Sequence, residues 1–283
     1  MHEIATADGL SFRARIAGPV NARVVVLLHG FPQTSRCWAA QLDALAAAGF
    51  RAVAFDQRGY SPGARPPDVE AYKPAALVRD VIGVADALGA ARFDLVGHDF
   101  GGMVAWMVAG HHPDRVRSLA IASTPHPAAF RSSYKSGGTD QGERSGYMRA
   151  FRAAERGAME QTLLADDAAG LRAFYAGLDD DAIDEYVRVL AEPGALVAAF
   201  DWYRSMSGAA SAATPAALMP TVYVVGNDDP TIGRDAAVAT ADHVAGPYAF
   251  HPLDGVGHWI PELAASTFTP LLLAHLGCYN TGP

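Results

Sequence analysis

Residues 93–102 of this chain read Phe-Asp-Leu-Val-Gly-His-Asp-Phe-Gly-Gly, and this stretch decides the fold. Its first part, Phe93–Val96, is a short and largely apolar run that predicts a buried parallel strand, and a helical pattern follows at Met103–Gly110. A sharp turn from strand to helix, flanked by glycines, is a nucleophile elbow, which pushes its central side chain out at the end of the strand. The central residue here is Asp99.

A carboxylate at the elbow determines which chemistry is available. In the common form of this turn the central residue is serine, so an ordinary serine esterase or peptidase mechanism has no nucleophile here. A carboxylate can instead attack an sp³ carbon and form an alkyl ester, which water must then cleave. The structural alternative for Asp99 is helix capping, because Asp is a favoured residue at a helix N-terminus.

Short apolar runs continue the strand series on both sides of the elbow. They are Val24–Leu28, Ala52–Phe55, Val116–Ala122, Val222–Val225 and Tyr248–Leu253. Helical patterns lie between or after them, at Trp38–Ala48, Ala75–Leu88 and Glu262–Leu276. This alternation predicts an α/β fold with a mostly parallel sheet covered by helices on both faces. Residues 2–17 predict an antiparallel hairpin that turns near Asp8-Gly9.

The strand and helix alternation breaks between residues 126 and 215, where the patterns are mostly helical. We therefore predict a core formed by residues 1–125 and 216–283, with a helical cap, residues 126–215, inserted between two strands of the sheet. The chain carries a net charge of −8 and no basic run, which argues against nucleic acid or an anionic membrane as a partner. Two widely spaced cysteines and the lack of a signal-like N-terminus favour a cytoplasmic protein.

Two further motifs are of the kind that a catalytic nucleophile elbow requires. His29-Gly30-Phe31-Pro32 directly follows a predicted strand, where the backbone N–H of Phe31 could form an oxyanion hole with that of Phe100. His258 lies in the glycine-rich loop after the last predicted strand, at the place expected for a general base.

The acid that orients such a histidine should follow the preceding strand, in the segment Val222–Pro230. Two candidates are adjacent there. We prefer Asp229 to Asp228, because Asp229 falls three residues after the strand-end glycine and directly before a proline.

Over nearly its whole length the chain resembles the epoxide hydrolases of the α/β-hydrolase superfamily. The matching segments are His29–Pro32, Asp56–Ser61, Gly97–Gly102, the Asp229 loop and Gly257-His258. Haloalkane and haloacetate dehalogenases share these features, and the cap separates the activities. The resemblance implies two cap tyrosines that donate hydrogen bonds to the epoxide oxygen. Asp201-Trp202-Tyr203-Arg204 resembles the segment with one of them, and Ser145–Phe151 the segment with the other, which gives Tyr203 and Tyr147.

A phenol near its usual pKa of about 10 stays protonated at neutral pH and can donate to an opening epoxide. Each tyrosine could instead only fill space in the cap, and Tyr175, Tyr186 and Tyr134 are the substitutes if the choice is wrong. Phe100 departs from the family, since many relatives have Trp directly after the nucleophile. The change removes an indole N–H that could hold a halide, which counts against dehalogenation.

The sequence therefore predicts an epoxide hydrolase that forms a hydroxyalkyl ester on Asp99, which water activated by His258 and Asp229 hydrolyses. A hydrolytic dehalogenase with the same residues is the first alternative, and a ligand-binding protein without turnover is the second. No metal or organic cofactor is required. We expect a small, apolar epoxide as substrate and a possible homodimer. Candidate substrate contacts are Pro32, Trp38, Trp106, Trp202 and Trp259.

Overall fold

The strands form one eight-stranded sheet in the order β1-β2-β4-β3-β5-β6-β7-β8. The computed structural model describes residues 1–136, 140–206 and 213–278, and every statement about the structure refers to these residues. The strands are β1 (His2–Ala5), β2 (Ser11–Ala17), β3 (Val24–Leu28), β4 (Arg51–Phe55), β5 (Phe93–His98), β6 (Val116–Ala122), β7 (Thr221–Gly226) and β8 (Tyr248–Leu253).

β1 and β2 form an antiparallel hairpin and β2 is antiparallel to β4, whereas the pairs from β4 to β8 are all parallel. The predicted hairpin and the mostly parallel sheet are thus confirmed. Parallel strands end at the same edge of a sheet. The residues that follow β3, β5, β7 and β8 therefore meet at one edge, which brings together motifs far apart in sequence.

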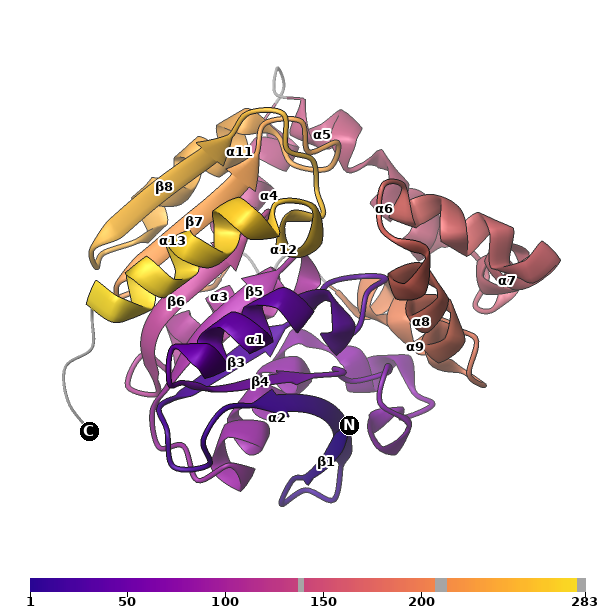
Figure 1. Ribbon diagram of the computed structural model, residues 1–283. Coiled ribbons are helices and arrows are strands. Elements are labelled where there is room, and N and C mark those ends of the chain that lie inside the picture. Colours follow the sequence, from indigo (N-terminus) through magenta and orange to yellow (C-terminus); the bar gives the residue numbers. More distant parts are fainter. Residues whose placement is uncertain (137–139, 207–212, 279–283) are drawn as a thin grey trace.

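Helices cover both faces of this sheet (Figure 1). α1 (Ala39–Ala47) and α13 (Ala265–Cys278) contact each other on one face, and α2 (Pro74–Ala87) and α3 (Phe100–His111) contact each other on the other face. α3 is buried along almost its whole length, which explains why its sequence is apolar on all sides. It begins three residues before the predicted start, directly after Asp99.

Two predicted helices are interrupted in the structure. The predicted helix Trp38–Ala48 is divided between a 3-10 helix at Ser35–Trp38 and α1, and the predicted helix Glu262–Leu276 is divided between α12 (Ile260–Leu263) and α13. Ala264 has φ −116°, outside the helical region, and this breaks the second pattern. The remaining short elements are α11 (Arg234–Ala239) and 3-10 helices at Pro62–Ala64, Val69–Tyr72, Ala173–Tyr175 and Thr240–His243. No described helix combines the length and apolar character needed to cross a membrane.

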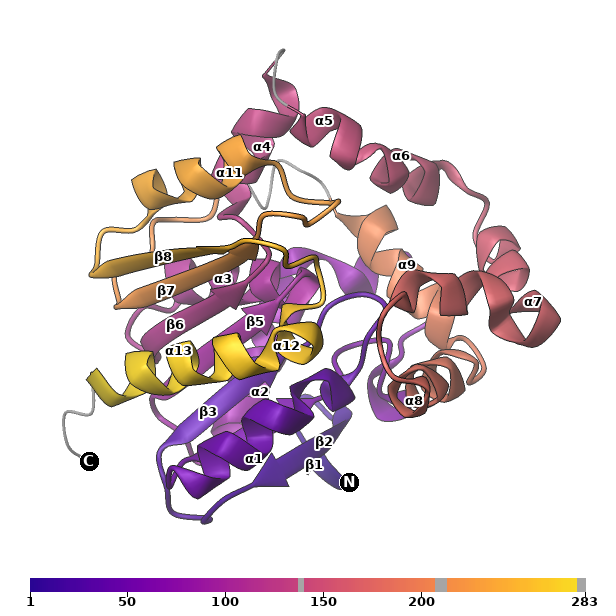
Figure 2. The ribbon, with the colours of Figure 1, turned by 45° about the horizontal axis from the view of Figure 1, so that its top comes forward.

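The segment between β6 and β7 is helical throughout its regular elements. It contains α4 (Pro127–Lys135), α5 (Gln141–Arg144), α6 (Gly146–Ala153), α7 (Ala158–Arg172), α8 (Asp180–Leu190) and α9 (Ala195–Ser205). Residues 137–139 and 207–212 of the predicted cap lie outside the described residues. α6 to α9 lie together beyond one end of the sheet (Figures 1 and 2). The division into a core domain and a cap domain stays a prediction.

A buried ion pair links the loop after β4 to α2 and, through the backbone, to α9. The Arg58 guanidinium donates two hydrogen bonds to the Asp80 carboxylate, at 2.7 and 2.5 Å, and both side chains are less than a tenth exposed. The indole N–H of Trp202 on α9 donates to the backbone oxygen of Arg58 at 2.9 Å. Because Tyr203 is the next residue on α9, this contact also fixes where that tyrosine lies.

We expect Asp80→Asn to lower the free energy of unfolding by about 3 kcal/mol, because it leaves the buried Arg58 without its counter-charge. Asp86→Asn, on the same helix, is the matched control, since Asp86 pairs with Arg115 while 61% exposed. That change should cost less than about 1 kcal/mol. Urea denaturation of both variants measures the difference, and equal losses would contradict the importance given to the buried pair.

Candidate active site

The elbow residue Asp99 has a backbone conformation that few side chains adopt. Its φ of 51° and ψ of −122° turn the chain sharply between β5 and α3. Gly101 permits the turn, because a Cβ there would lie 2.2 Å from the Leu28 backbone oxygen. The Asp99 side chain accepts no hydrogen bond from the second or third N–H group of α3, as a capping side chain would. Its carboxylate is therefore available for contacts away from the helix, and the capping alternative does not describe its position.

The Asp99 carboxylate lies against the strand end that carries the His29–Pro32 motif. The backbone N–H of Phe31 donates to Asp99 Oδ1 at 2.8 Å, and the N–H of Phe100 also bonds to this carboxylate. The approach is close enough that a Cβ on Gly30 would lie 2.3 Å from the Asp99 Cβ. The two N–H groups named as an oxyanion hole from the sequence thus converge on one carboxyl group.

His258 lies between Asp99 and Asp229. Its Nδ1 is 2.8 Å from Asp229 Oδ2, and its Nε2 is 3.6 Å from Asp99 Oδ2. The other oxygen of Asp229 accepts from the backbone N–H of Thr231 at 2.8 Å and from its hydroxyl at 2.7 Å. Asp228 is exposed and contributes a backbone N–H to the oxygen of Val256. The structure therefore brings Asp229, and not Asp228, to the histidine.

The loop that carries His258 is held through its backbone. The carbonyl oxygen of His258 accepts from His98 Nε2 at 2.9 Å and from the Ser123 hydroxyl at 3.0 Å. The Thr124 hydroxyl donates to the backbone oxygen of Asp99 at 2.7 Å, which steadies the elbow itself. None of these three residues, nor Thr231, was predicted from the sequence to take part in the site. Only the position of His98 beside the nucleophile and of Thr231 near the acid could have drawn attention to them.

Charge and burial set the protonation of this site. Burial disfavours the imidazolium of His258, but the carboxylates of Asp229 and Asp99 outweigh burial and raise its pKa to about 9. Burial also opposes ionisation of Asp229, yet His258 and the bonds from Thr231 lower its pKa to about 2. Burial raises the pKa of Asp99, against the effect of His258 and the two backbone N–H groups. Burial lowers the pKa of His98 to about 3, which leaves that imidazole neutral.

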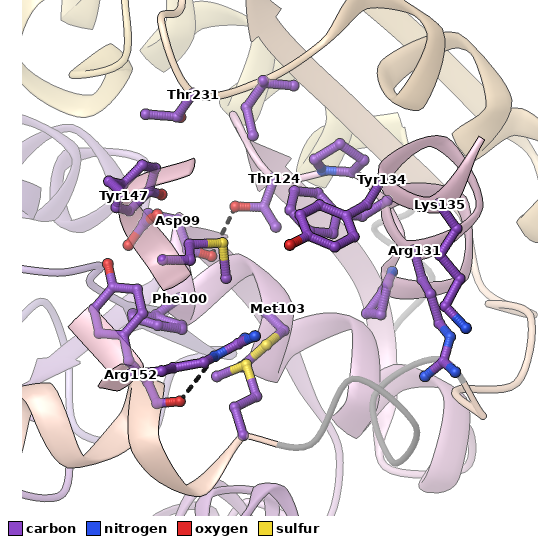
Figure 3. A pocket seen from close by; sticks show the side chains of 17 residues that line it. Asp99, Phe100, Met103, Thr124, Arg131, Tyr134, Lys135, Tyr147, Arg152 and Thr231 are labelled. Atoms are coloured by element: carbon purple, nitrogen blue, oxygen red, sulfur yellow. Dashed lines mark hydrogen bonds between the residues drawn. The ribbon is translucent and has the colours of Figure 1, made fainter. Parts of the chain in front are cut away.

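A cavity of about 440 Å³ opens above Asp99, and its size suits a small organic ligand (Figure 3). The Asp99 side chain is 21% exposed, whereas the Asp229 side chain is fully buried. The apolar part of the lining comes from both the sheet side and the inserted helices. It consists of Phe100, Met103, Pro125, Pro127, Phe130, Met148, Met206 and Ile232.

Tyr147 on α6 and Tyr203 on α9 both line the cavity with Asp99, and Figure 3 shows Tyr147 next to Asp99. Their ring centroids are 6.3 Å apart, and the Tyr203 ring packs 4.6 Å from the Phe100 ring. Burial is the first cause that raises the pKa of each phenol, and the charge of Asp99 raises both further. Both side chains therefore stay protonated at neutral pH and keep an O–H to donate.

The substitute tyrosines do not lie in this position. The Tyr175 hydroxyl donates to the Pro32 backbone oxygen at 2.7 Å, and the Tyr186 hydroxyl donates to Glu262 at 2.7 Å. Tyr134 lines the cavity but accepts a hydrogen bond from Arg149 at 3.2 Å and lies across the cavity from Asp99 in Figure 3.

The predicted substrate contacts Pro32, Trp38, Trp106, Trp202 and Trp259 require correction, because none of them lines the cavity. Trp38 and Trp106 are fully buried, the former against Phe268 and the latter with its indole N–H on the Thr124 backbone oxygen. The indole N–H of Trp202 donates to the backbone oxygen of Arg58, and the backbone oxygen of Pro32 accepts from the Tyr175 hydroxyl. The Trp259 ring packs 4.8 Å from the His258 ring instead of facing the cavity.

Side chains that could bind a metal ion do not cluster in the described residues. No group of three or more His, Cys, Asp or Glu side chains in this part of the chain is arranged to hold a metal ion. The chemistry that the arrangement itself supports is nucleophilic attack by a carboxylate, followed by general-base activation of water.

Comparisons with known proteins place this geometry in a family. Residues 23–265 match the family described as the alpha/beta hydrolase fold. Epoxide hydrolase A of Mycobacterium tuberculosis is 31% identical over 95% of this chain and 95% of its own length. The structure of epoxide hydrolase A from Mycobacterium thermoresistibile has a TM-score of 0.85 at 25% identity, covering 98% of this chain and 97% of that one.

A structure of an epoxide hydrolase from Bacillus megaterium has a TM-score of 0.88 and covers 98% of this chain and 100% of that one. Because the two sequences are only 23% identical, this similarity shows a shared fold and nothing further. The family match and the relative from Mycobacterium tuberculosis carry the assignment. This chain belongs to the α/β-hydrolase fold family, in its epoxide hydrolase branch.

Proposed function

We propose that the protein is an epoxide hydrolase that converts a small epoxide into a vicinal diol through an ester on Asp99. The observation that carries the proposal is the pair of protonated phenols, Tyr147 and Tyr203, beside the Asp99 carboxylate in one cavity. The names of the relatives support the same substrate class. A dehalogenase would need donors for a halide, and no indole N–H lies directly after the nucleophile.

The first step opens the epoxide. Asp99 Oδ2 attacks a ring carbon, the bond between that carbon and the ring oxygen breaks, and the oxygen takes a proton from a phenol. Oδ1, which already accepts from the Phe31 N–H, becomes the carbonyl oxygen of the ester. Because an alkoxide is a poor leaving group, the two hydroxyls are needed to stabilise the charge as it develops.

The second step hydrolyses the ester. His258 takes a proton from water, and the resulting hydroxide attacks the side-chain carbonyl carbon of Asp99. The Phe31 and Phe100 N–H groups hold the oxyanion, the bond to the diol oxygen breaks, and that oxygen takes a proton from the His258 imidazolium as the diol leaves. The proton of the new Asp99 carboxyl group returns to the phenolate left by ring opening, which restores the starting state of all three groups. Asp229 keeps the imidazole oriented and stabilises its charged form.

The inserted helices serve as a cap in this proposal. They supply both phenols and much of the apolar lining, whereas Asp99, Asp229 and His258 all follow strands of the sheet. Closure of the cavity between the two parts would exclude bulk water from the epoxide while the ester forms.

We expect His258→Gln to stall at the ester, because no base remains to activate water. Intact-mass spectrometry after mixing with an epoxide panel such as styrene oxide should then show a gain equal to the whole epoxide, mapping to Asp99. Asp99→Asn is the matched control and should show no gain. A gain from haloalkanes alone, equal to the substrate without HX, would instead identify a dehalogenase.

Replacement of each phenol tests the ring-opening step. Tyr147→Phe and Tyr203→Phe should each slow ester formation about 10- to 100-fold in single-turnover experiments, because the developing alkoxide loses one donor. The double variant should be slower than either. Tyr248→Phe is the control: its hydroxyl is buried in β8 without a hydrogen-bond partner among the described residues. A double variant that forms the ester at the wild-type rate would contradict the role of the phenols.

The two steps should depend on pH in different ways. Ester formation needs ionised Asp99, so its rate should fall as the pH drops through the pKa of that carboxyl. Ester hydrolysis needs neutral His258, so its rate should rise with pH. Esterification removes the charge of Asp99, one of the two charges that raise the His258 pKa to about 9 in the free enzyme. Rapid-quench measurements of the hydrolysis step should therefore give an apparent pKa below that value, and one at or above it would contradict this account.

A further inference from the structure

The outer part of the cavity is basic, in contrast to the chain as a whole. Arg131 and Lys135, one turn apart on α4, and Arg152 on α6 line the cavity together with its apolar residues. Asp99 is the only carboxylate among the lining residues that the structure describes. Residues 126–156 contain six basic and three acidic residues, although the net charge of the protein is −8. Positive charge is thus concentrated in the helices that supply the basic part of the cavity lining.

These cations lack the acidic partners that other basic side chains have. Arg58, Arg156 and Arg204 are paired with Asp80, Asp201 and Glu160, respectively. Within the described ranges, neither Arg131 nor Lys135 has a carboxylate within the 4.0 Å of an ion pair. Arg152 donates to the Tyr203 backbone oxygen at 3.1 Å, and no carboxylate of the described residues forms an ion pair with it. The charges are therefore available to an anion that enters the cavity.

The position of the cations relative to the nucleophile defines the shape of a suitable ligand. In Figure 3, Thr124, Met103 and Tyr134 lie between Asp99 and the pair Arg131 and Lys135. A ligand with its reactive carbon at Asp99 would extend along this largely apolar wall before it reached the basic pair. Arg and Lys bind carboxylate or phosphate oxygens through charge-assisted hydrogen bonds, and Arg can do so with two parallel bonds.

We propose that the epoxide substrate of this enzyme carries an anionic group at the end remote from the ring, and that Arg131 and Lys135 bind this group. The inference rests on the proposed epoxide hydrolysis and specifies its substrate. Because Lys135 is exposed and Arg131 half-buried, water and salt weaken the interaction. The expected preference over a neutral analogue is therefore moderate, about 5- to 20-fold in kcat/KM.

A series of terminal epoxides tests the proposal, each with a carboxylate at the other end of an alkyl chain of increasing length and each paired with its primary amide. The acid should exceed the amide in kcat/KM, and the ratio should pass through a maximum at the chain length that spans the distance from Asp99 to the basic pair. A general attraction of anions would raise the ratio equally at every length. Added salt should lower the ratio at the maximum.

The double variant Arg131→Gln/Lys135→Gln should bring the ratio at the maximum close to one. Acid and amide react through the same Asp99 chemistry, so a general loss of activity cancels from the ratio. Lys73→Gln/Arg172→Gln is the matched control: it removes one Lys and one Arg charge outside the cavity, from side chains that pair with Glu70 and Asp184. This control should keep the wild-type ratio.

Turnover of the amides without any preference for the acids would overturn the inference and leave the epoxide hydrolase proposal intact. A preference that survives in Arg131→Gln/Lys135→Gln would overturn it as well. If neither series reacts, and His258→Gln forms no adduct, the proposed function itself fails. Calorimetric titration with the corresponding diols then still decides whether the cavity prefers the acid, because binding of a diol needs no catalysis.

Discussion

The active site depends on the close backbone contact between the end of β3 and the turn after β5. Asp99 occupies a left-handed conformation, which costs of order 1–3 kcal/mol and persists only where the surroundings impose it. Gly30 and Gly101 allow the two chain segments to approach, and the Thr124 hydroxyl holds the turn from the other side. The same contact places the Phe31 N–H on the carboxylate. The strained turn and the proposed oxyanion hole therefore depend on the same backbone contact.

The ionisation of each buried group in the site depends on the charges of the other two. Asp229 and Asp99 raise the pKa of His258 to about 9, and His258 in turn helps to lower the pKa of Asp229 to about 2. At neutral pH the pKa of about 9 favours an imidazolium between the two carboxyl groups, and its charge opposes the rise in the pKa of Asp99 that burial causes. On the proposed mechanism, esterification removes one carboxylate from the set and lowers the pKa of His258, so that more of the imidazole is neutral at the moment when a base is required.

Residues whose positions follow from the order of the strands along the chain could be predicted from the sequence. A parallel sheet brings the ends of β5, β7 and β8 to one edge, so a strand pattern and one short motif after each strand were enough to select Asp99, Asp229 and His258. Tyr147 and Tyr203 came from a resemblance, because no periodicity in the inserted helices shows which tyrosine faces the sheet. The structure places both beside the nucleophile.

Contacts that depend on side-chain direction were not predictable. Ser123 reaches the backbone of His258 across 135 positions of sequence, and no local pattern indicates such a partner. The tryptophans were assigned to the pocket because they are large and apolar. Those properties fit the core equally well, and only packing shows that Trp38 and Trp106 belong there. The basic side chains around the outer cavity carried no signal, because isolated Arg and Lys residues resemble an ordinary solvated surface.

The insertion between β6 and β7 divides the proposed catalytic groups by their origin in the chain. The groups for ester hydrolysis follow strands of the sheet, whereas the proton donors for ring opening and the basic residues for substrate choice lie on inserted helices. In the proposed mechanism Asp99 takes part in both steps, whereas the tyrosines and the basic pair serve only ring opening and substrate choice. On this proposal, substitutions in the inserted helices can change which epoxide is accepted without altering the strained turn at Asp99.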